Sequence, residues 1–293
     1  MICNFCPRKC NVDRATKTGY CGVGEKIKIA RAAPHYWEEP CLSGKNGSGT
    51  VFFSGCNLGC IFCQNQDISH RAFGKEVTED ELLKIFDNLL SKGVHNLNLV
   101  TPSHYINQIA SALEKFKSPV PVIYNTSSYE SVEELKKLEG LVDIYLPDLK
   151  YYDSEKSLKY SKAADYFEKA SQAVLEMYRQ VGDLVISENG MAKSGMIIRH
   201  LVLPGNISQT EKIFEWVSEN LPLETHISLM RQYTPFGKAL ETPPLNRAVT
   251  GREYKIAKEK LYNLGFYNIF FQQKESISES FIPEFDLEGV DIF

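Results

Sequence analysis

The sequence lacks the features that mark membrane-bound and secreted proteins. No apolar run approaches the ~18 residues of a transmembrane helix, and the N-terminus has no charged segment followed by an apolar one, so we expect no signal peptide. The net charge of −4 gives no footprint of a nucleic-acid-binding protein. Internal repeats and low-complexity segments are absent as well. The sequence therefore predicts a cytoplasmic protein without nucleic-acid or membrane partners.

Cysteine, in contrast, is well represented, with eight residues in the chain. In a cytoplasmic protein this number indicates metal ligands rather than disulfides. Cys56, Cys60 and Cys63 follow directly on the apolar run 50–53, with Phe62 before the last of them. Thiolates hold iron–sulfur clusters, usually four at a time, so three close together predict a cubane cluster with one open iron. The alternatives are a zinc site that lacks its fourth ligand and plain buried cysteines.

A second group of cysteines lies at the N-terminus with the spacing C-x2-C-x3-C-x10-C: Cys3, Cys6, Cys10 and Cys21. Four thiolates can close a tetrahedral Zn²⁺ site or hold an auxiliary [4Fe-4S] cluster. Four reduced cysteines without a ligand are the remaining alternative. We favour zinc, because so small a module needs a metal to fold.

The remainder of the chain alternates between short apolar strands and amphipathic helices. Strands are predicted at 51–54, 96–100, 120–124, 142–146, 196–203, 227–230 and 266–272. Capping boxes are predicted at Thr78 with Glu81, Ser131 with Glu134, Ser208 with Glu211 and Thr250 with Glu253. This rhythm indicates parallel βαβ units. We predict an α/β fold, a partial TIM-like (β/α)6 barrel with a small N-terminal cysteine-rich module.

The predicted division of the chain has three parts. Residues 1–48 form the cysteine-rich metal-binding module, residues 49–273 the partial barrel, and residues 274–293 an acidic tail. Phe281, Phe285 and Phe293 are spaced along the tail, which either docks through them or frays. In a barrel of this kind the functional site lies at the carboxyl ends of the strands, and Cys56 lies at such an end.

The Cys56–Cys63 segment resembles the motif of the radical S-adenosylmethionine (SAM) enzymes. The resemblance implies a [4Fe-4S] cluster whose open iron takes the amino and carboxylate groups of SAM, with Phe62 against the adenine. Further stretches, among them 6–10, 38–40, 53–57, 62–65 and 199–204, are similar to the PflX-type branch of pyruvate formate-lyase activating enzyme-like proteins. Asn65, which ends one of these stretches, is therefore expected at the cofactor.

Polar residues at three other strand ends extend the resemblance. Where many radical SAM proteins have Gly-Gly-Glu for the SAM amino group, this chain has Thr101 and His104 as candidates, although Ser103 between them would also cap a helix. Asn125 stands where the activating enzymes have Asp. Asp148 and Lys150 match their Asp-Leu-Lys, whose carboxylate helps to hold a monovalent cation beside SAM; the alternative is a solvated ion pair.

Arg199 and His200 interrupt an apolar strand, so each must face a polar interior or have a partner. The activating enzymes have Arg near SAM at the position of Arg199, which is the candidate SAM residue, and we expect a structural role for His200.

The resemblance implies an enzyme that cleaves SAM reductively to a 5′-deoxyadenosyl radical and abstracts hydrogen from a protein or peptide. Flavodoxin or ferredoxin would supply the electron, and Arg8, Lys9 and Arg14 would offer basic contacts at the barrel opening. Modification of a small molecule is one alternative. A non-catalytic iron–sulfur or metal-binding redox protein is another.

Overall fold

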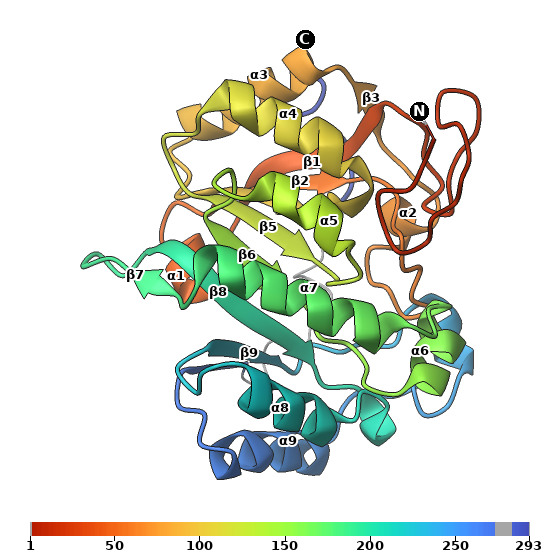
Figure 1. Cartoon of the computed structure of the whole chain (residues 1–293), viewed down its shortest axis with the longest axis vertical. Helices are drawn as coiled ribbons and strands as arrows, with labels where there is room; N and C mark the ends of the chain where they lie inside the picture. The colour runs from red at the N-terminus through yellow and green to blue at the C-terminus, as the bar shows by residue number, and fades with distance from the viewer. Residues whose placement is uncertain (1, 273–282, 293) are drawn as a thin grey trace.

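The computed structural model of the chain describes residues 2–272 and 283–292, which form one mostly parallel sheet with helices packed on it (Figure 1). Each parallel strand pairs with the next in the order β2 (Ser48–Phe53), β4 (Leu97–Val100), β5 (Val122–Thr126), β6 (Ile144–Pro147), β8 (Ala192–Leu201), β9 (His226–Met230) and β10 (Ile269–Phe271). Beyond β2, the strand β1 (Ile27–His35) is antiparallel, and β3 (Lys75–Val77) follows it. The described sheet is thus open, with β3 and β10 at its edges.

Helices alternate with these parallel strands: α3 (Glu79–Ser91), α4 (Ile106–Phe116), α5 (Val132–Leu135), α7 (Tyr166–Val181), α8 (Thr210–Asn220) and α9 (Gly251–Asn263). In Figure 1, α4, α5, α7 and α8 lie in front of the sheet. The alternation confirms the predicted partial TIM-like (β/α)6 barrel, and β10 follows the last helix. None of the helices in the described part of the chain is long and apolar enough to cross a membrane.

Two of the predicted capping boxes are confirmed, and both start long helices. The Thr78 hydroxyl accepts from the backbone N–H of Glu81, whose carboxylate accepts from the Thr78 N–H, so α3 begins where the sequence predicts. Thr250 and Glu253 form the same reciprocal pair at the start of α9. Each box satisfies backbone donors that would otherwise lack partners in the first turn.

The other two predicted boxes are wrong. Ser131 precedes α5, but its side chain makes no capping hydrogen bond. The Ser208 hydroxyl donates to the Leu201 carbonyl (3.3 Å) instead of capping α8, which begins two residues later at Thr210. The hydroxyl of Ser208 is thus used to tie the end of β8 to the loop that follows it.

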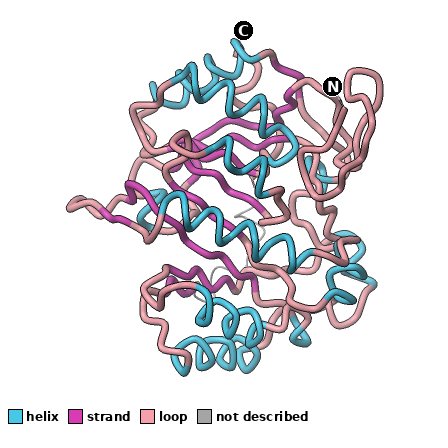
Figure 2. Tube along the Cα trace, viewed as in Figure 1, coloured by secondary structure: helices cyan, strands magenta, loops and turns pink. Residues whose placement is uncertain are grey.

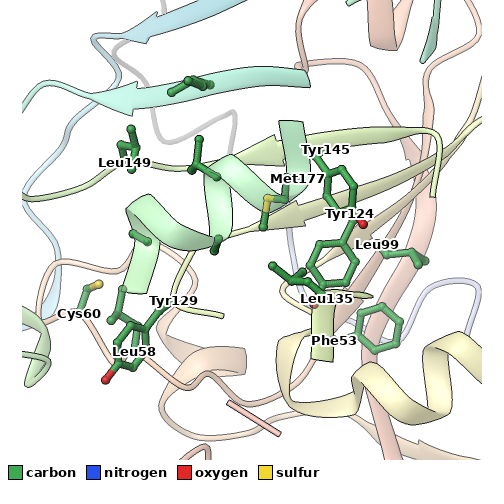
Figure 3. Close-up of a cluster of buried hydrophobic side chains, with 14 of the residues drawn as sticks. Phe53, Leu58, Cys60, Leu99, Tyr124, Tyr129, Leu135, Tyr145, Leu149 and Met177 are labelled. Carbon is green, nitrogen blue, oxygen red and sulfur yellow. The ribbon is translucent and has the colours of Figure 1, made fainter. Parts of the chain in front are cut away.

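Aromatic side chains fill the space between the sheet and its helices, as Figure 3 shows for Tyr124 and Tyr145 beside Met177. Tyr124 and Tyr145 are fully buried on neighbouring strands, with ring centroids 5.9 Å apart in an edge-to-face arrangement. The Tyr145 hydroxyl donates to Gln180 Oε1 (2.6 Å). A buried tyrosine usually finds such a partner for its hydroxyl, so that its ring can be buried without leaving a polar group unsatisfied.

The described part of the acidic tail is docked on β1. Backbone hydrogen bonds join Leu287 N to Ala30 O (3.1 Å) and Ala32 N to Glu288 O (2.8 Å). Phe285 packs on Phe52, with ring centroids 5.5 Å apart. Of the two alternatives for the tail, docking therefore holds for residues 283–292, whereas Phe281 and Phe293 lie outside the described residues.

A buried carboxyl group joins the ends of β4 and β5. Glu130 Oε1 accepts hydrogen bonds from Ser103, Thr126 and Tyr124, all of them neutral hydroxyls. Ser103 is therefore engaged with Glu130 and does not cap the following helix. Burial raises the pKa of Glu130 to about 7, because the charged form loses its hydration without gaining a counter-charge.

We predict that Glu130→Gln removes part of the pH dependence of stability. The stability contributed by the protonated carboxyl is fully present below its ordinary pKa of 4.5 and is lost as the pH rises through about 7. The wild type should therefore lose about 2–3 kcal/mol relative to the variant between pH 5 and pH 8. Anaerobic urea unfolding at both pH values measures this difference. The exposed Glu133→Gln is the control, and a gap between wild type and Glu130→Gln that does not change with pH would contradict the prediction.

Candidate functional site

A cavity of about 280 Å³ opens at the carboxyl ends of the parallel strands. In Figure 1 this end of the sheet faces the N-terminal loops, α2 (Gln66–Ser69) and α6 (Ser154–Ser161). The cavity brings together nearly all residues that the sequence placed at the site: Cys56, Cys60, Phe62, Cys63, Asn65, Thr101, Asn125, Asp148, Lys150 and Arg199. Their roles stay predictions, but their convergence follows the strand-end rule of such barrels.

The loop that carries Cys56, Cys60 and Cys63 leaves β2 through a constrained glycine. Gly55 has a φ of +89°, and a Cβ on it would lie 2.7 Å from the carbonyl oxygen of Cys21. The Cys56 N–H donates to that same carbonyl (3.3 Å). A side chain at position 55 would therefore push the cysteine loop away from the N-terminal segment.

Each of the three thiols accepts a hydrogen bond. Cys56 Sγ accepts from the Leu58 N–H (3.4 Å), Cys60 Sγ from the Ser161 hydroxyl (2.9 Å) and Cys63 Sγ from the Ser69 hydroxyl (3.3 Å). Donors of this kind hold thiolate ligands in place and tune the cluster that they bind. The three sulfurs thus fit the protein ligands of a cluster that keeps one iron open. As free thiols Cys60 and Cys63 stay protonated, since burial raises the pKa of Cys60 to about 12 and also raises that of Cys63.

A cation lies next to these thiols. The Lys150 ammonium contacts Asp148 Oδ2 at 2.5 Å and interacts electrostatically with Cys60. Burial opposes the charge of Lys150, but Asp148, together with Cys60 and Tyr166, raises the pKa of Lys150 above its usual range. Both side chains are about one-fifth exposed, so the pair is not the freely solvated one that the sequence left open.

Arg199 contacts two carboxylates from the segment after β1. Its Nε donates to Glu39 Oε1 (3.0 Å), and its Nη2 contacts both Glu38 and Glu39. Glu38 is also held by Asn98 Nδ2 (2.9 Å). Burial would raise the pKa of Glu39, but the Arg199 guanidinium outweighs burial and holds it below its usual value. Arg199 therefore faces a polar interior, as its place in an apolar strand requires.

Two residues of the cavity lining are constrained, Thr101 by its backbone conformation and Phe62 by its packing. Thr101 has a φ of +59°, a left-handed conformation that is uncommon for a β-branched residue and costs roughly 1–3 kcal/mol. Its N–H donates to Asn125 O (2.8 Å). Phe62 lies at the cavity and also packs edge-on against Tyr233, with centroids 5.9 Å apart.

Other residues singled out in the sequence lie outside the cavity. His104 is buried, with its Nε2 2.8 Å from Ser54 O, just before the loop that carries Cys56. Burial lowers the pKa of His104 to about 3, so the imidazole is neutral. His200 contacts Leu149 O and Thr210 Oγ1 (2.6 and 2.8 Å), which are structural contacts. Arg14 is buried and donates to the His104 and Gly24 carbonyls. It is thus not available for a substrate, contrary to the sequence-based expectation.

Several cavity residues were not predicted from the sequence. Gln232 and Tyr233 follow the end of β9, and the strand-end rule applied there would have found them. Ser69 lines the cavity and donates to Cys63, six residues before it, but no motif marked it. Ser161, which donates to Cys60 from outside the lining, lies 101 residues along the chain and therefore carries no local signal. Trp37 and Pro283 line the cavity from segments outside the parallel strands.

The N-terminal cysteines gather around Gly19. A Cβ on Gly19 would lie 3.5 Å from Cys21 Sγ, 3.6 Å from Cys10 Sγ and 3.9 Å from Cys3 Sγ. The Cys6 thiol interacts electrostatically with those of Cys3 and Cys21. Over residues 2–272 and 283–292 no three Cys, His, Asp or Glu side chains are already spaced as ligands of one ion. Three of the thiols thus lie around Gly19, and Cys6 interacts with two of them. Four thiolates are a set of ligands that suits zinc or an iron–sulfur cluster.

Comparisons with known proteins agree with this geometry. Residues 50–217 match the sequence profile of the radical SAM superfamily. An uncharacterized protein of Methanocaldococcus jannaschii is 34% identical over 275 residues, which cover 89% of this chain and 75% of that protein. A pyruvate formate-lyase-activating enzyme of Clostridium pasteurianum is 56% identical over 34 residues, 12% of this chain and 14% of that enzyme. The superfamily resemblance read from the cysteine motif is confirmed.

Among solved structures, the crystal structure of HydG, a maturase of the [FeFe]-hydrogenase, matches with a TM-score of 0.50 at 14% identity. The match covers 78% of this chain and 52% of the HydG chain, so the chain spans about half the length of that protein. At this identity the likeness shows the fold alone.

We predict unequal costs for the two sides of the Arg199 contact. Arg199→Met leaves Glu38 and Glu39 buried without a cation, which should lower the free energy of unfolding by about 3–5 kcal/mol. Glu39→Gln leaves Arg199 paired with Glu38 and should lower it by about 1–2 kcal/mol. Anaerobic urea unfolding at pH 7 measures both. Equal losses for the two variants would show that the carboxylates do not depend on Arg199.

Proposed function

The chain belongs to the radical SAM superfamily, and we propose that it cleaves SAM reductively at a [4Fe-4S] cluster and abstracts hydrogen from a protein or peptide substrate. The observation that carries the proposal is the set of thiols of Cys56, Cys60 and Cys63, each with its own hydrogen-bond donor, at a cavity lined by polar strand ends. The cluster, when bound and reduced, supplies the electron that splits SAM into methionine and a 5′-deoxyadenosyl radical.

The chain's own residues bind and orient the two cofactors. Cys56, Cys60 and Cys63 would hold three irons and leave the fourth to the amino and carboxylate groups of SAM. Lys150 is the cation beside Cys60, and we propose that it faces the SAM carboxylate. Asp148 would hold Lys150 in place and contribute to a monovalent-cation site. Arg199 contacts Glu38 and Glu39, and we propose that it helps to position the neighbouring Asp148 and Lys150.

The cavity offers further groups to the remaining parts of SAM. Phe62 presents an aromatic ring for the adenine, and Asn65, Thr101 and Asn125 present polar atoms at the same lining. The buried His104 would act only through the loop that it supports. Radical SAM enzymes take their electron from donors such as flavodoxin or ferredoxin, so we propose such a partner and a cytoplasmic setting.

A protein or peptide substrate is favoured by the surface beside the cavity. Tyr36 and Trp37 are 53% and 58% exposed, and Trp37 also lines the cavity. Exposed aromatic side chains next to a site are typical of surfaces that bind other proteins. The 34-residue likeness to a pyruvate formate-lyase-activating enzyme points the same way. A small-molecule substrate is the second candidate, because the cavity itself is of small-ligand size.

We predict that the anaerobically reduced protein releases 5′-deoxyadenosine from SAM and that Cys60→Ala abolishes this release. Asp148→Ala should raise the SAM dissociation constant about tenfold, a loss of about 1.4 kcal/mol, because Lys150 loses its partner. The absorption spectrum of the cluster should not change. Asp87→Asn on the exposed side of α3 is the matched control. Unchanged SAM affinity in Asp148→Ala would count against the assignment, and a Cys60→Ala protein that still cleaves SAM would end the cluster proposal.

The substrate class has its own test. Reduced protein and SAM are incubated with the products of neighbouring genes, and a glycyl EPR doublet or a peptide mass change is expected. Trp37→Ala should weaken this reaction while substrate-free SAM cleavage persists. Tyr267→Ala, an exposed aromatic before β10 and thus at the amino end of the strands, is the control. If turnover appears only with a low-molecular-weight cell extract, the small-molecule alternative replaces the protein substrate.

A further inference from the structure

Arg8 joins the N-terminal cysteines to the loop that carries Cys56. It lies between Cys6 and Cys10, and its Nε donates to Asn57 O (2.7 Å) while its Nη2 donates to Leu58 O (3.2 Å). Nη2 also donates to Ser161 O (3.1 Å), and Ser161 is the residue whose hydroxyl donates to Cys60 Sγ. One guanidinium thus clamps the cysteine loop against the end of α6, which contradicts the expectation that Arg8 is free to meet a substrate.

Two further hydrogen bonds join the N-terminal segment to the loop that carries Cys56. The Tyr20 hydroxyl donates to Leu58 O (3.4 Å), and the Cys56 N–H donates to Cys21 O (3.3 Å). The Arg8 guanidinium is 3.9 Å from the centroid of the Tyr20 ring that it covers. Cysteine residues of the N-terminal group therefore flank Arg8 and Tyr20 alike, and these two side chains reach the cluster loop.

The N-terminal segment has little of its own to keep Arg8 in place. Figure 2 draws it as loop, without helix or strand. A few backbone hydrogen bonds shape it, among them Lys9 N to Cys6 O (3.1 Å) and Asn11 N to Cys3 O (3.0 Å). A segment so poor in regular structure needs a metal or a similar link to stay ordered. The cradle at Gly19, surrounded by thiols, is where such a link fits.

We infer that Cys3, Cys6, Cys10 and Cys21 bind Zn²⁺, and that this ion fixes Arg8 against the cluster loop and thereby sets the reduction potential of the cluster on Cys56, Cys60 and Cys63. The inference rests on the proposed function in one respect, namely that these three cysteines hold a cluster. Arg8 is a positioning residue in this scheme, since it touches the ligand-bearing loop and not SAM.

The effect on the potential has a definite sign. A cluster becomes more negative when it takes up an electron, so a fixed positive charge nearby favours the reduced state. Arg8 supplies that charge and also holds Ser161, the donor to Cys60. Loss of the guanidinium should therefore make the cluster harder to reduce. Lysine in its place keeps the charge but cannot reach several carbonyls at once.

The test uses the full chain purified anaerobically. Wild type should contain about one zinc and four irons per chain. EPR-monitored redox titration of Arg8→Ala should show the reduction equilibrium shifted about tenfold toward the oxidised cluster, which is about 59 mV for one electron, with zinc unchanged. Arg8→Lys should fall between. Lys17→Ala, which removes an exposed charge from the same module, should match the wild type.

A variant of the metal site tests whether zinc is needed to hold Arg8 in place. Cys10→Ser should lose zinc and show the same shift as Arg8→Ala, and the double variant should shift no further, because both changes remove one coupled contact. If Cys10→Ser does not fold, Arg8→Ala and Arg8→Lys still decide, since they keep all four cysteines. A wild-type potential in Arg8→Ala, a wild-type potential in zinc-free Cys10→Ser, or eight irons without zinc would each overturn the inference. Failure of SAM cleavage with these shifts present would instead count against the proposed function.

Discussion

The buried contact of Arg199 with Glu38 and Glu39 is the interaction on which the cavity depends. The described sheet is open, with β3 and β10 at its edges, so no backbone pairing closes the barrel. Arg199 on β8 instead reaches the segment after β1 on the other side of the cavity. Charged groups buried in this way tolerate little displacement, because a charge that loses its partner stays buried without compensation.

The backbone of Arg199 also aligns the segment that carries the other charges of the site. The Leu149 N–H donates to Arg199 O (2.9 Å), so the residues on either side of Leu149, Asp148 and Lys150, are held in register with the arginine. Lys150 thus lies close enough to Cys60 to interact with it. Arg199 thus has two separate roles: its side chain binds Glu38 and Glu39, and its backbone carbonyl holds the segment that carries Asp148 and Lys150.

The fold and the ligand cysteines could be predicted from the sequence, because the patterns that indicate them are local. Each capping box, Thr78 with Glu81 and Thr250 with Glu253, spans only a few residues, and so does the group Cys56, Cys60 and Cys63. The alternation of strands and helices is likewise visible in short windows of the sequence. Strand-end placement then predicted the polar lining. What the sequence did not show are contacts between distant segments. Ser161 lies 101 residues from Cys60, and Glu39 lies 160 residues from Arg199, so no spacing rule could pair them. Ser69 and Ser208 lie near their partners in the sequence, but no motif marks their hydroxyls as donors.

One unpredicted strand explains why the two cysteine groups meet. β1 follows the N-terminal cysteines, and it runs antiparallel to β2, with Ile29 opposite Phe53. Antiparallel pairing brings the start of one strand to the end of the other. Cys21, just before β1, therefore arrives beside Cys56, just after β2, and the glycine at position 55 leaves room for the Cys21 carbonyl. Sheet topology thus brings the N-terminal module to the cluster loop, and the Arg8 and Tyr20 side chains add hydrogen bonds to that loop.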